Sequence, residues 1–355
     1  GGIVAIVTVG IGAGGCSMGE ESLGARGAAE MQGTSFTFAP PDGTRGVRTE
    51  RRRYEIALVG TPLRNLEEDE LTWSVAAHRA GDSTTIDQEL THVTMKHDGE
   101  TLIDRDIDPG AVKAQLIVDR AGNLVDVRGL ENASKTLRSL VVGRPGGPST
   151  RGADRDLSTE DLKGLVTERY DETVGDVIGH PNKVGSSWTT QGEPGSPVAS
   201  RTVSVQSVEP CGGATCARLH ATYKLDPRSL VTLAGAVVRD YAKWAGQSPS
   251  KMSVQAAMYS MEGTLLTEPA TMVNHHASLD ASGKVLFAGP KRPMEIDLTG
   301  KTEIAFDYVR PVTSGLTPSG STPSGLTPSG STPSGLTPSG STLVGAAADA
   351  RPSFL

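Results

Sequence analysis

Apolar and polar residues alternate through most of this chain, and this alternation restricts its fold more than any other feature. Residues 71–77 (LTWSVAA) place an apolar side chain at every second position, and residues 304–308 (IAFDY) do the same. A period of two is typical of β-strands with one buried face. Turn signals such as residues 40–43 (PPDG) separate the alternating stretches. We therefore expect antiparallel strands between residues 34 and 309.

Three stretches have the spacing of amphipathic helices instead. They cover residues 130–141, 158–178 and 227–245, and the second begins with Ser158 and Asp161 in the pattern of a capping box. Together with the strands they predict an α+β fold, in which curved antiparallel sheet is covered by a few packed amphipathic helices.

The strand-like sequence divides into two similar halves. Residues 34–142 and 182–310 are each mostly β with one helix, and residues 143–181 supply a glycine-rich loop and a linking helix. The turn pattern of residues 119–124 recurs at residues 280–285. Two interpretations stay open: a duplicated, two-lobed architecture, or chance recurrence of a turn that is common in antiparallel proteins.

The last part of the chain is of low complexity. Residues 315–342 repeat a ten-residue unit of Gly, Ser, Thr, Leu and Pro, with a proline at every fifth position. Because proline lacks an amide hydrogen, neither a helix nor a strand ladder survives this spacing. Residues 311–355 therefore form a predicted Gly/Ser/Thr/Pro-rich tail outside the folded region.

The chain opens with an uncharged apolar stretch that ends at a cysteine. This stretch is shorter than the ~20 residues that a membrane span requires, and it has the pattern of a secretory signal whose basic start precedes Gly1. Residues 13–16 (AGGC) resemble the lipobox of bacterial lipoproteins, with Ala13 where that family favours leucine. The alternative is a buried strand with Cys16 in the core.

The resemblance to bacterial lipoproteins implies a processing and an anchoring step. In that family the signal is removed before the cysteine, and the thiol then carries a diacylglyceryl group. Residues 1–15 would be the signal segment, Cys16 the lipidated residue and residues 16–33 a flexible tether. The expected location is the bacterial cell envelope, on the outer membrane or the cell surface, with the membrane as a partner through the lipid anchor.

The other two cysteines lie five positions apart in a predicted hairpin. Residues on both sides of Cys211 and Cys216 alternate, and Gly212 and Gly213 allow the chain to reverse between them. Such a hairpin brings the two cysteines within disulfide distance. A zinc site is the alternative, but zinc requires four ligands, and His220 would stand about 13 Å along the strand from Cys216. We predict a Cys211–Cys216 disulfide.

Composition excludes several other functions. The chain has 34 basic and 41 acidic residues and a net charge of −7, which is unsuited to nucleic-acid binding. Asp104, Asp106 and Asp108 do not complete a calcium loop, and residues 81–83 (GDS) lack the partners of a hydrolase site. No pair among the seven histidines has ligand spacing; they are His78, His92, His97, His180, His220, His275 and His276. The basic run at residues 51–53 is flanked by Glu50 and Glu55, which favours a self-neutralised surface.

No catalytic, cofactor or metal site is therefore predicted. The first functional hypothesis is a non-enzymatic binding or structural role in the envelope, in which the curved sheet and the helix at residues 227–245 enclose a cavity for an apolar ligand. The second is an envelope enzyme whose site residues are dispersed in the sequence. A cavity without titratable groups would favour the first hypothesis, and a cluster with shifted pKa values the second.

Overall fold

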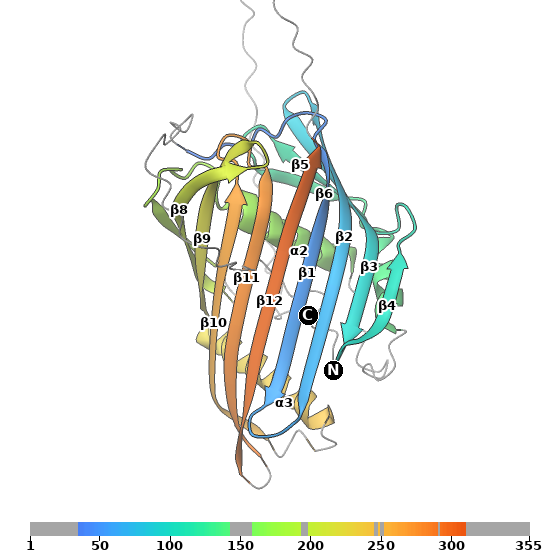
Figure 1. The fold of residues 1–355 in the computed structure, drawn as a ribbon, viewed down its shortest axis with the longest axis vertical. Helices are drawn as coiled ribbons and strands as arrows, with labels where there is room; N and C mark the ends of the chain where they lie inside the picture. Colours follow the sequence, from blue (N-terminus) through green and yellow to red (C-terminus); the bar gives the residue numbers. More distant parts are fainter. Residues whose placement is uncertain are drawn as a thin grey trace, which may run out of the picture. The chain divides into compact units, whose positions relative to one another are not determined.

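One continuous antiparallel sheet of twelve strands dominates the protein (Figure 1). The computed structural model describes residues 35–142, 158–192, 198–244, 248, 252–289 and 292–309, all within one compact unit. The predicted signal segment, Cys16, the tether, the loop at residues 143–157 and residues 310–355 lie outside the described residues.

Each half of the chain supplies six strands. The first half forms β1 (Arg45–Leu58), β2 (Arg64–Ala80), β3 (Ser83–His97), β4 (Glu100–Asp106), β5 (Lys113–Asp119) and β6 (Leu124–Arg128). The second half forms β7 (Ser187–Gln191), β8 (Val198–Cys211), β9 (Ala214–Leu225), β10 (Ser253–Thr267), β11 (Asn274–Ala288) and β12 (Pro293–Val309). Their spatial order is β6-β5-β3-β2-β1-β12-β11-β10-β9-β8-β7. Strand β4 pairs with the part of β3 that does not pair with β5.

The pairing of β1 with β12 joins the two halves. Its register runs from Arg45 opposite Val309 to Leu58 opposite Ile296, so both strands are paired along most of their length. Residues 34–142 and 182–310 thus contribute to one sheet, and the two-lobed alternative is wrong. The turn expected at residues 280–285 is also absent, because these residues lie within β11 and pair with β10 and β12.

The helices are few and lie on one side of the sheet (Figure 1). They are α1 (Ala133–Val142), α2 (Thr159–Tyr170), which continues into the π-helical turn η2 (Asp171–Gly175), and α3 (Pro227–Trp244). The capping box predicted for α2 is present: the Asp161 amide donates to Ser158 Oγ at 3.0 Å, and the Ser158 amide donates to Asp161 Oδ2 at 2.9 Å.

The predicted α+β class is wrong, because the described chain is mostly antiparallel sheet. The three helical patterns are conspicuous in the sequence, but the helices that they form make up only a small part of the described chain. The central strand β1 was also hard to recognise. Its inward positions include Arg48, Glu50 and Arg52, which are buried or nearly so, and these charged residues conceal the usual apolar alternation.

Two apolar clusters stabilise the sheet where helices cover it. The larger cluster joins α2 and η2 to strands from both halves, through residues such as Leu162, Tyr170 and Val174. The smaller one packs Ala234, Val237 and Val238 of α3 against β1, β11 and β12. The helices therefore pack directly against the inner face of the sheet.

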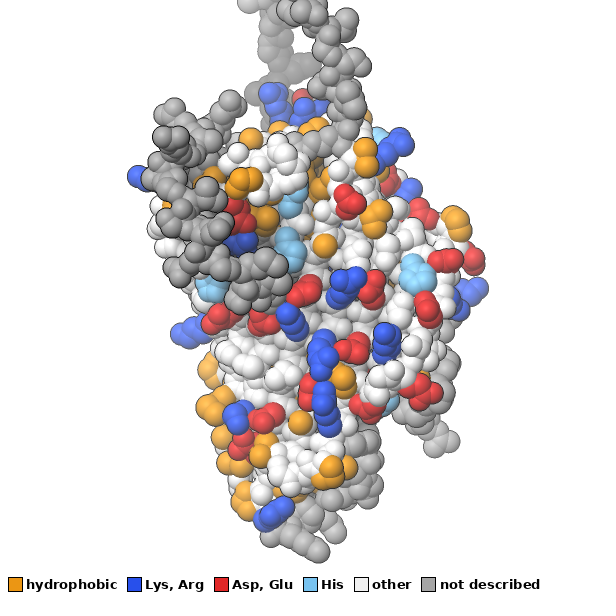
Figure 2. Space-filling model, viewed as in Figure 1, with side chains coloured by type: hydrophobic (Ala, Val, Ile, Leu, Met, Phe, Trp, Pro, Cys, Tyr) orange, Lys and Arg blue, Asp and Glu red, His pale blue; other side chains and the backbone are white. Residues whose placement is uncertain are grey.

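The outer face of the sheet is polar. Figure 2 shows basic and acidic side chains interleaved on this face. Arg51 pairs with Glu70 at 2.9 Å, and Arg53 pairs with Glu68 at the same distance. Within the described ranges, no helix combines the length and apolar character of a membrane span.

Candidate functional site

A largely apolar cavity lies between the inner face of the sheet and helices α1 and α2. Its volume is about 270 Å³, close to the lower limit for small-molecule sites. The apolar lining includes residues of the sheet and of both helices: Leu71, Leu90, Val93, Leu116, Leu137, Leu162, Val166, Ile304 and Phe306. Among the α3 residues whose side chains the structure describes, none lines it, so the sequence prediction that the helix at residues 227–245 encloses a cavity is wrong for this cavity.

Three arginines that line the cavity surround the buried carboxylate of Glu50. We call these four residues the arginine cluster: Arg48, Arg52, Arg169 and Glu50. Alternation on β1 directs Arg48, Glu50 and Arg52 inward, and Arg169 reaches them from α2. Arg52 Nε donates to Glu50 Oε1 at 2.7 Å, and Arg169 Nη2 donates to Glu50 Oε2 at 3.0 Å. The Glu50 carboxylate, which is fully buried, thus links the central strand to the helix above it.

The arginines determine the ionisation of Glu50. Burial by itself raises the pKa of this carboxyl, but the charges of Arg169, Arg52 and Arg48 outweigh burial and hold the pKa well below its usual value. Burial also lowers the pKa of Arg48 to about 9, with the neighbouring Arg169 acting in the same direction. Glu50 and Arg48 are therefore both charged at neutral pH.

Arg48 is the member of the cluster with the weakest contacts. Its Nη1 donates to Gln88 Oε1 at 2.9 Å, whereas its Nη2 lies 3.9 Å from Glu50 Oε2, beyond hydrogen-bond distance. Its guanidinium carbon lies 4.6 Å from the centroid of the Trp73 ring. The Nε of Arg48 and the Nε1 of Trp73 are both buried without a hydrogen-bond partner.

A second buried polar group lies where η2 meets β8 and β9. Arg201 Nη1 approaches Asp176 Oδ2 at 3.4 Å, and its guanidinium lies over the ring of Tyr223. Glu172 Oε2 and Arg201 Nε are buried without partners. Burial raises the pKa of Glu172 to about 7, although the positive charge of Arg201 opposes the shift.

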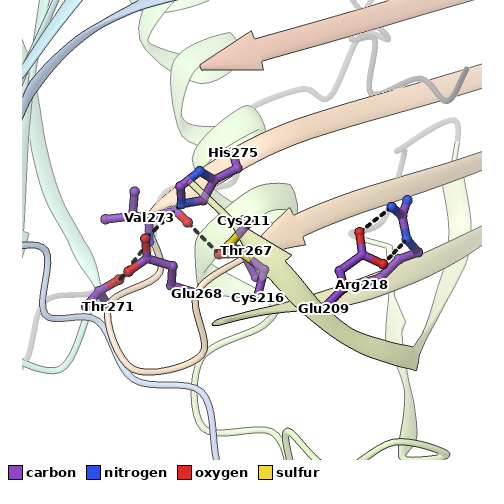
Figure 3. Close-up of a disulfide and its surroundings, with 9 residues drawn as sticks. All are labelled: Glu209, Cys211, Cys216, Arg218, Thr267, Glu268, Thr271, Val273 and His275. Carbon is purple, nitrogen blue, oxygen red and sulfur yellow. Dashed lines mark hydrogen bonds and ion pairs between the residues drawn. A yellow bond between two sulfur atoms is a disulfide. The ribbon is translucent and has the colours of Figure 1, made fainter. Parts of the chain in front are cut away.

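The predicted disulfide between Cys211 and Cys216 is confirmed (Figure 3). It links β8 to β9, with Cα atoms 5.8 Å apart, and both cysteines are buried. The turn between them uses Gly212 and Gly213 with φ of 51° and 82°, as a tight hairpin requires.

The histidine beside this disulfide is His275 of β11, not His220. A Cβ atom on Gly212 would lie 2.9 Å from His275 Cε1, so the glycine allows the ring to approach the turn. His275 Nε2 lies 2.7 Å from Glu268 Oε1. Ligand atoms of Cys211, Cys216 and His275 lie within 4.8 Å of one another, but sulfurs joined in a disulfide are not the thiolates that bind zinc.

The remaining residues considered from the sequence are separated from the cavity. Asp104 and Asp106 lie on β4, where each approaches a ring nitrogen of His92 at 2.9 Å. Residues 81–83 span the turn between β2 and β3. Within the described part of the chain, no His, Cys, Asp or Glu side chain lines the cavity.

The arginine cluster was not predicted, because residues 51–53 resemble one surface run in the sequence. Arg51 and Arg53 do lie outside, whereas Arg52 points inward. The parity of β1 contained the signal: Arg48, Glu50 and Arg52 share the face of Leu58, which is buried.

No known protein family matches the sequence, and no curated protein matches it. DynF from the dynemicin biosynthesis pathway of Micromonospora chersina is 7% identical, with 86% of this chain and 98% of DynF covered and a TM-score of 0.16. An exported protein with a YmcC-like fold from Bacteroides fragilis is 9% identical, with 78% and 100% covered and a TM-score of 0.22. A β-barrel-like protein from Brucella abortus is 10% identical, with 76% and 99% covered and a TM-score of 0.19. Similarities this low establish neither a common fold nor a common function.

Substituting Glu50 tests the arginine cluster. Glu50→Gln removes the charge that compensates three buried arginines, so we expect the free energy of unfolding to fall by roughly 3–5 kcal/mol. Glu70→Gln, which breaks the exposed pair with Arg51 on the outer face, should cost less than about 1 kcal/mol. Urea unfolding of both variants at pH 7 measures the difference, and equal losses would contradict the role given to Glu50.

A carboxylate paired with a cation makes the free energy of unfolding rise with pH. Glu172 should have the opposite effect and make it fall as pH rises. Its pKa is about 7 in the folded protein and ~4.3 in an unfolded chain. Between these values the folded state holds a proton that the unfolded chain has lost, so this group lowers stability as pH rises. The free energy of unfolding of Glu172→Gln minus that of wild type should therefore increase by about 1–3 kcal/mol from pH 4.5 to pH 8.5.

The exposed Glu262 on β10 provides a control for this pH effect. Glu262→Gln should follow the wild-type stability curve at every pH. If Glu172→Gln also follows it, Glu172 titrates normally in the folded protein.

Proposed function

We propose that this protein is a lipid-anchored bacterial envelope protein that binds an apolar, chain-like ligand in the cavity beneath α1 and α2. The observation that carries the proposal is the cavity itself, with about 270 Å³ of space surrounded mainly by aliphatic and aromatic side chains. Empty apolar space destabilises a fold in proportion to its volume. A ligand that fills the space recovers this loss.

The chemistry of the lining favours binding over catalysis. Among the described residues, no His, Cys, Asp or Glu side chain lines the cavity. Burial raises the pKa of the lining tyrosines Tyr170 and Tyr308 further above neutrality, so neither phenol exchanges a proton near pH 7. General acid–base catalysis requires a group that exchanges a proton near the working pH.

The envelope location rests on two features of the sequence and one of the structure. The opening apolar stretch and residues 13–16 are the two sequence features. The structural feature is the disulfide between Cys211 and Cys216, which is typical of proteins that fold outside the reducing cytosol.

Filling the cavity should abolish ligand binding. Val166 of α2 lines the cavity, and Val166→Phe adds a ring to this lining. We expect affinity for the neutral apolar probe N-phenyl-1-naphthylamine, measured by fluorescence titration, to fall about tenfold or more. Val125→Phe on β6 is the matched control, because Val125 is 64% exposed. Equal probe affinity in the two variants, or no binding by wild type, contradicts the proposal.

The anchor is tested separately by intact mass spectrometry of membrane-extracted protein. We expect loss of residues 1–15, the mass of a diacylglyceryl group on Cys16, and the loss of two hydrogens that the disulfide accounts for. Cys16→Ser should release the protein from the membrane fraction. Wild-type protein that keeps Gly1, or that leaves membranes in plain buffer, would contradict lipidation.

A further inference from the structure

The arrangement of donors in the cavity indicates which chemical group its ligand carries. The side chain of Arg48 is 7% exposed and makes one hydrogen bond, to the neutral amide of Gln88. Its Nε has no partner, and the nearest carboxylate, that of Glu50, lies outside hydrogen-bond distance. A buried cation with an unused donor is an unusual feature, because charged groups inside proteins are normally fully paired.

A second unused donor lies beside the first. Trp73 is directly opposite Arg48 in the β1–β2 register, and the Arg48 guanidinium lies over its ring. The indole Nε1 of Trp73 is also buried without a partner. Both side chains line the cavity, and the two N–H groups without partners come from neighbouring strands.

The charges around these donors favour an anion. Arg48, Arg52 and Arg169 supply three positive charges and Glu50 supplies one negative charge, so the arginine cluster has a net charge of +2. Lys113, which also lines the cavity, is already paired with Asp87 at 3.3 Å.

We propose that the ligand is an alkyl-chain carboxylate whose head group binds Arg48 and Trp73. One carboxylate oxygen accepts a hydrogen bond from Arg48 Nε and the other accepts one from Trp73 Nε1, while the chain occupies the apolar part of the cavity. This inference rests on the proposed function and adds the chemical class of the ligand. A carboxylate suits the site because its two oxygens accept from two separate donors and its negative charge is opposite in sign to the net charge of the cluster.

Paired probes test the head group and the chain independently. Isothermal titration of the full chain, freed of bound lipid on a hydrophobic resin, is carried out at pH 8 with decanoate, decanol and acetate. Decanoate and decanol share the alkyl chain and differ in charge, whereas acetate has the charge without the chain. We expect decanoate to bind about tenfold or more tightly than decanol, and acetate not to bind detectably at millimolar concentration.

Substitutions then test which side chains produce the preference for decanoate over decanol. Arg48→Met keeps a long apolar side chain and removes the cation, and Trp73→Phe keeps an aromatic ring and removes the Nε1 donor. Arg48→Met should lower the ratio of decanoate affinity to decanol affinity about tenfold or more, and Trp73→Phe should lower it about threefold or more. Arg51→Met is the control and should leave this ratio unchanged, since Arg51 lies on the outer face of the same strand and pairs with Glu70. The far-UV circular dichroism of each variant verifies that the protein remains folded.

The outcomes separate this inference from the function on which it rests. If wild type binds decanoate and decanol equally, or if Arg48→Met keeps the preference, the head-group site is wrong while the apolar cavity stands. If acetate binds as tightly as decanoate, the site takes small anions and not amphiphiles, which also overturns the inference. Binding of neither alkyl compound overturns both proposals.

Discussion

The backbone ladder between β1 and β12 is the interaction on which the rest of this structure depends. These strands are the first and the last of the described sheet, and their pairing closes the longest sequence separation in the protein. Without it, the two halves of the chain would each present a long unpaired edge, which is a site for aggregation. With it, inward side chains from both halves meet on one face, and the cavity has walls from β2, β3 and β5 on one side and β12 on the other.

The same central position explains why β1 carries charged residues inward. A carboxylate in the middle of a sheet face can be reached by arginines of its own strand and by one from the covering helix, as Glu50 is. Buried ion pairs add little net stability, because desolvation offsets most of their attraction. Here they fix the position of a helix. Arg169 ties α2 to the sheet through Glu50, and the hydroxyl of the adjacent Tyr170 donates to the carbonyl of Gly122 at 2.8 Å. These two contacts hold α2 over the cavity.

Much of the local structure could be predicted, and the candidate site could not. The capping box at Ser158, the three helices and the Cys211–Cys216 hairpin each depend on residues close in the sequence, and all are present. The fold class was wrong because amphipathic helices are easily recognised, whereas a charged inward face resembles a solvated strand. Arg48, Trp73 and Arg169 come from three different elements, so their spacing in the sequence does not indicate that they lie close together.

By itself, the sequence determined where strands, helices and turns form, and which two cysteines could be bridged. These features follow from side-chain periodicity and turn chemistry, which act over a few residues. Only the tertiary structure decided that the halves make one sheet, that the cavity lies beneath α2 instead of α3, and that Arg48 and Trp73 keep unused donors inside it. Those features depend on contacts between residues that are distant in the sequence. The free energies of packing and desolvation at such contacts depend on both partners, so no single segment determines them.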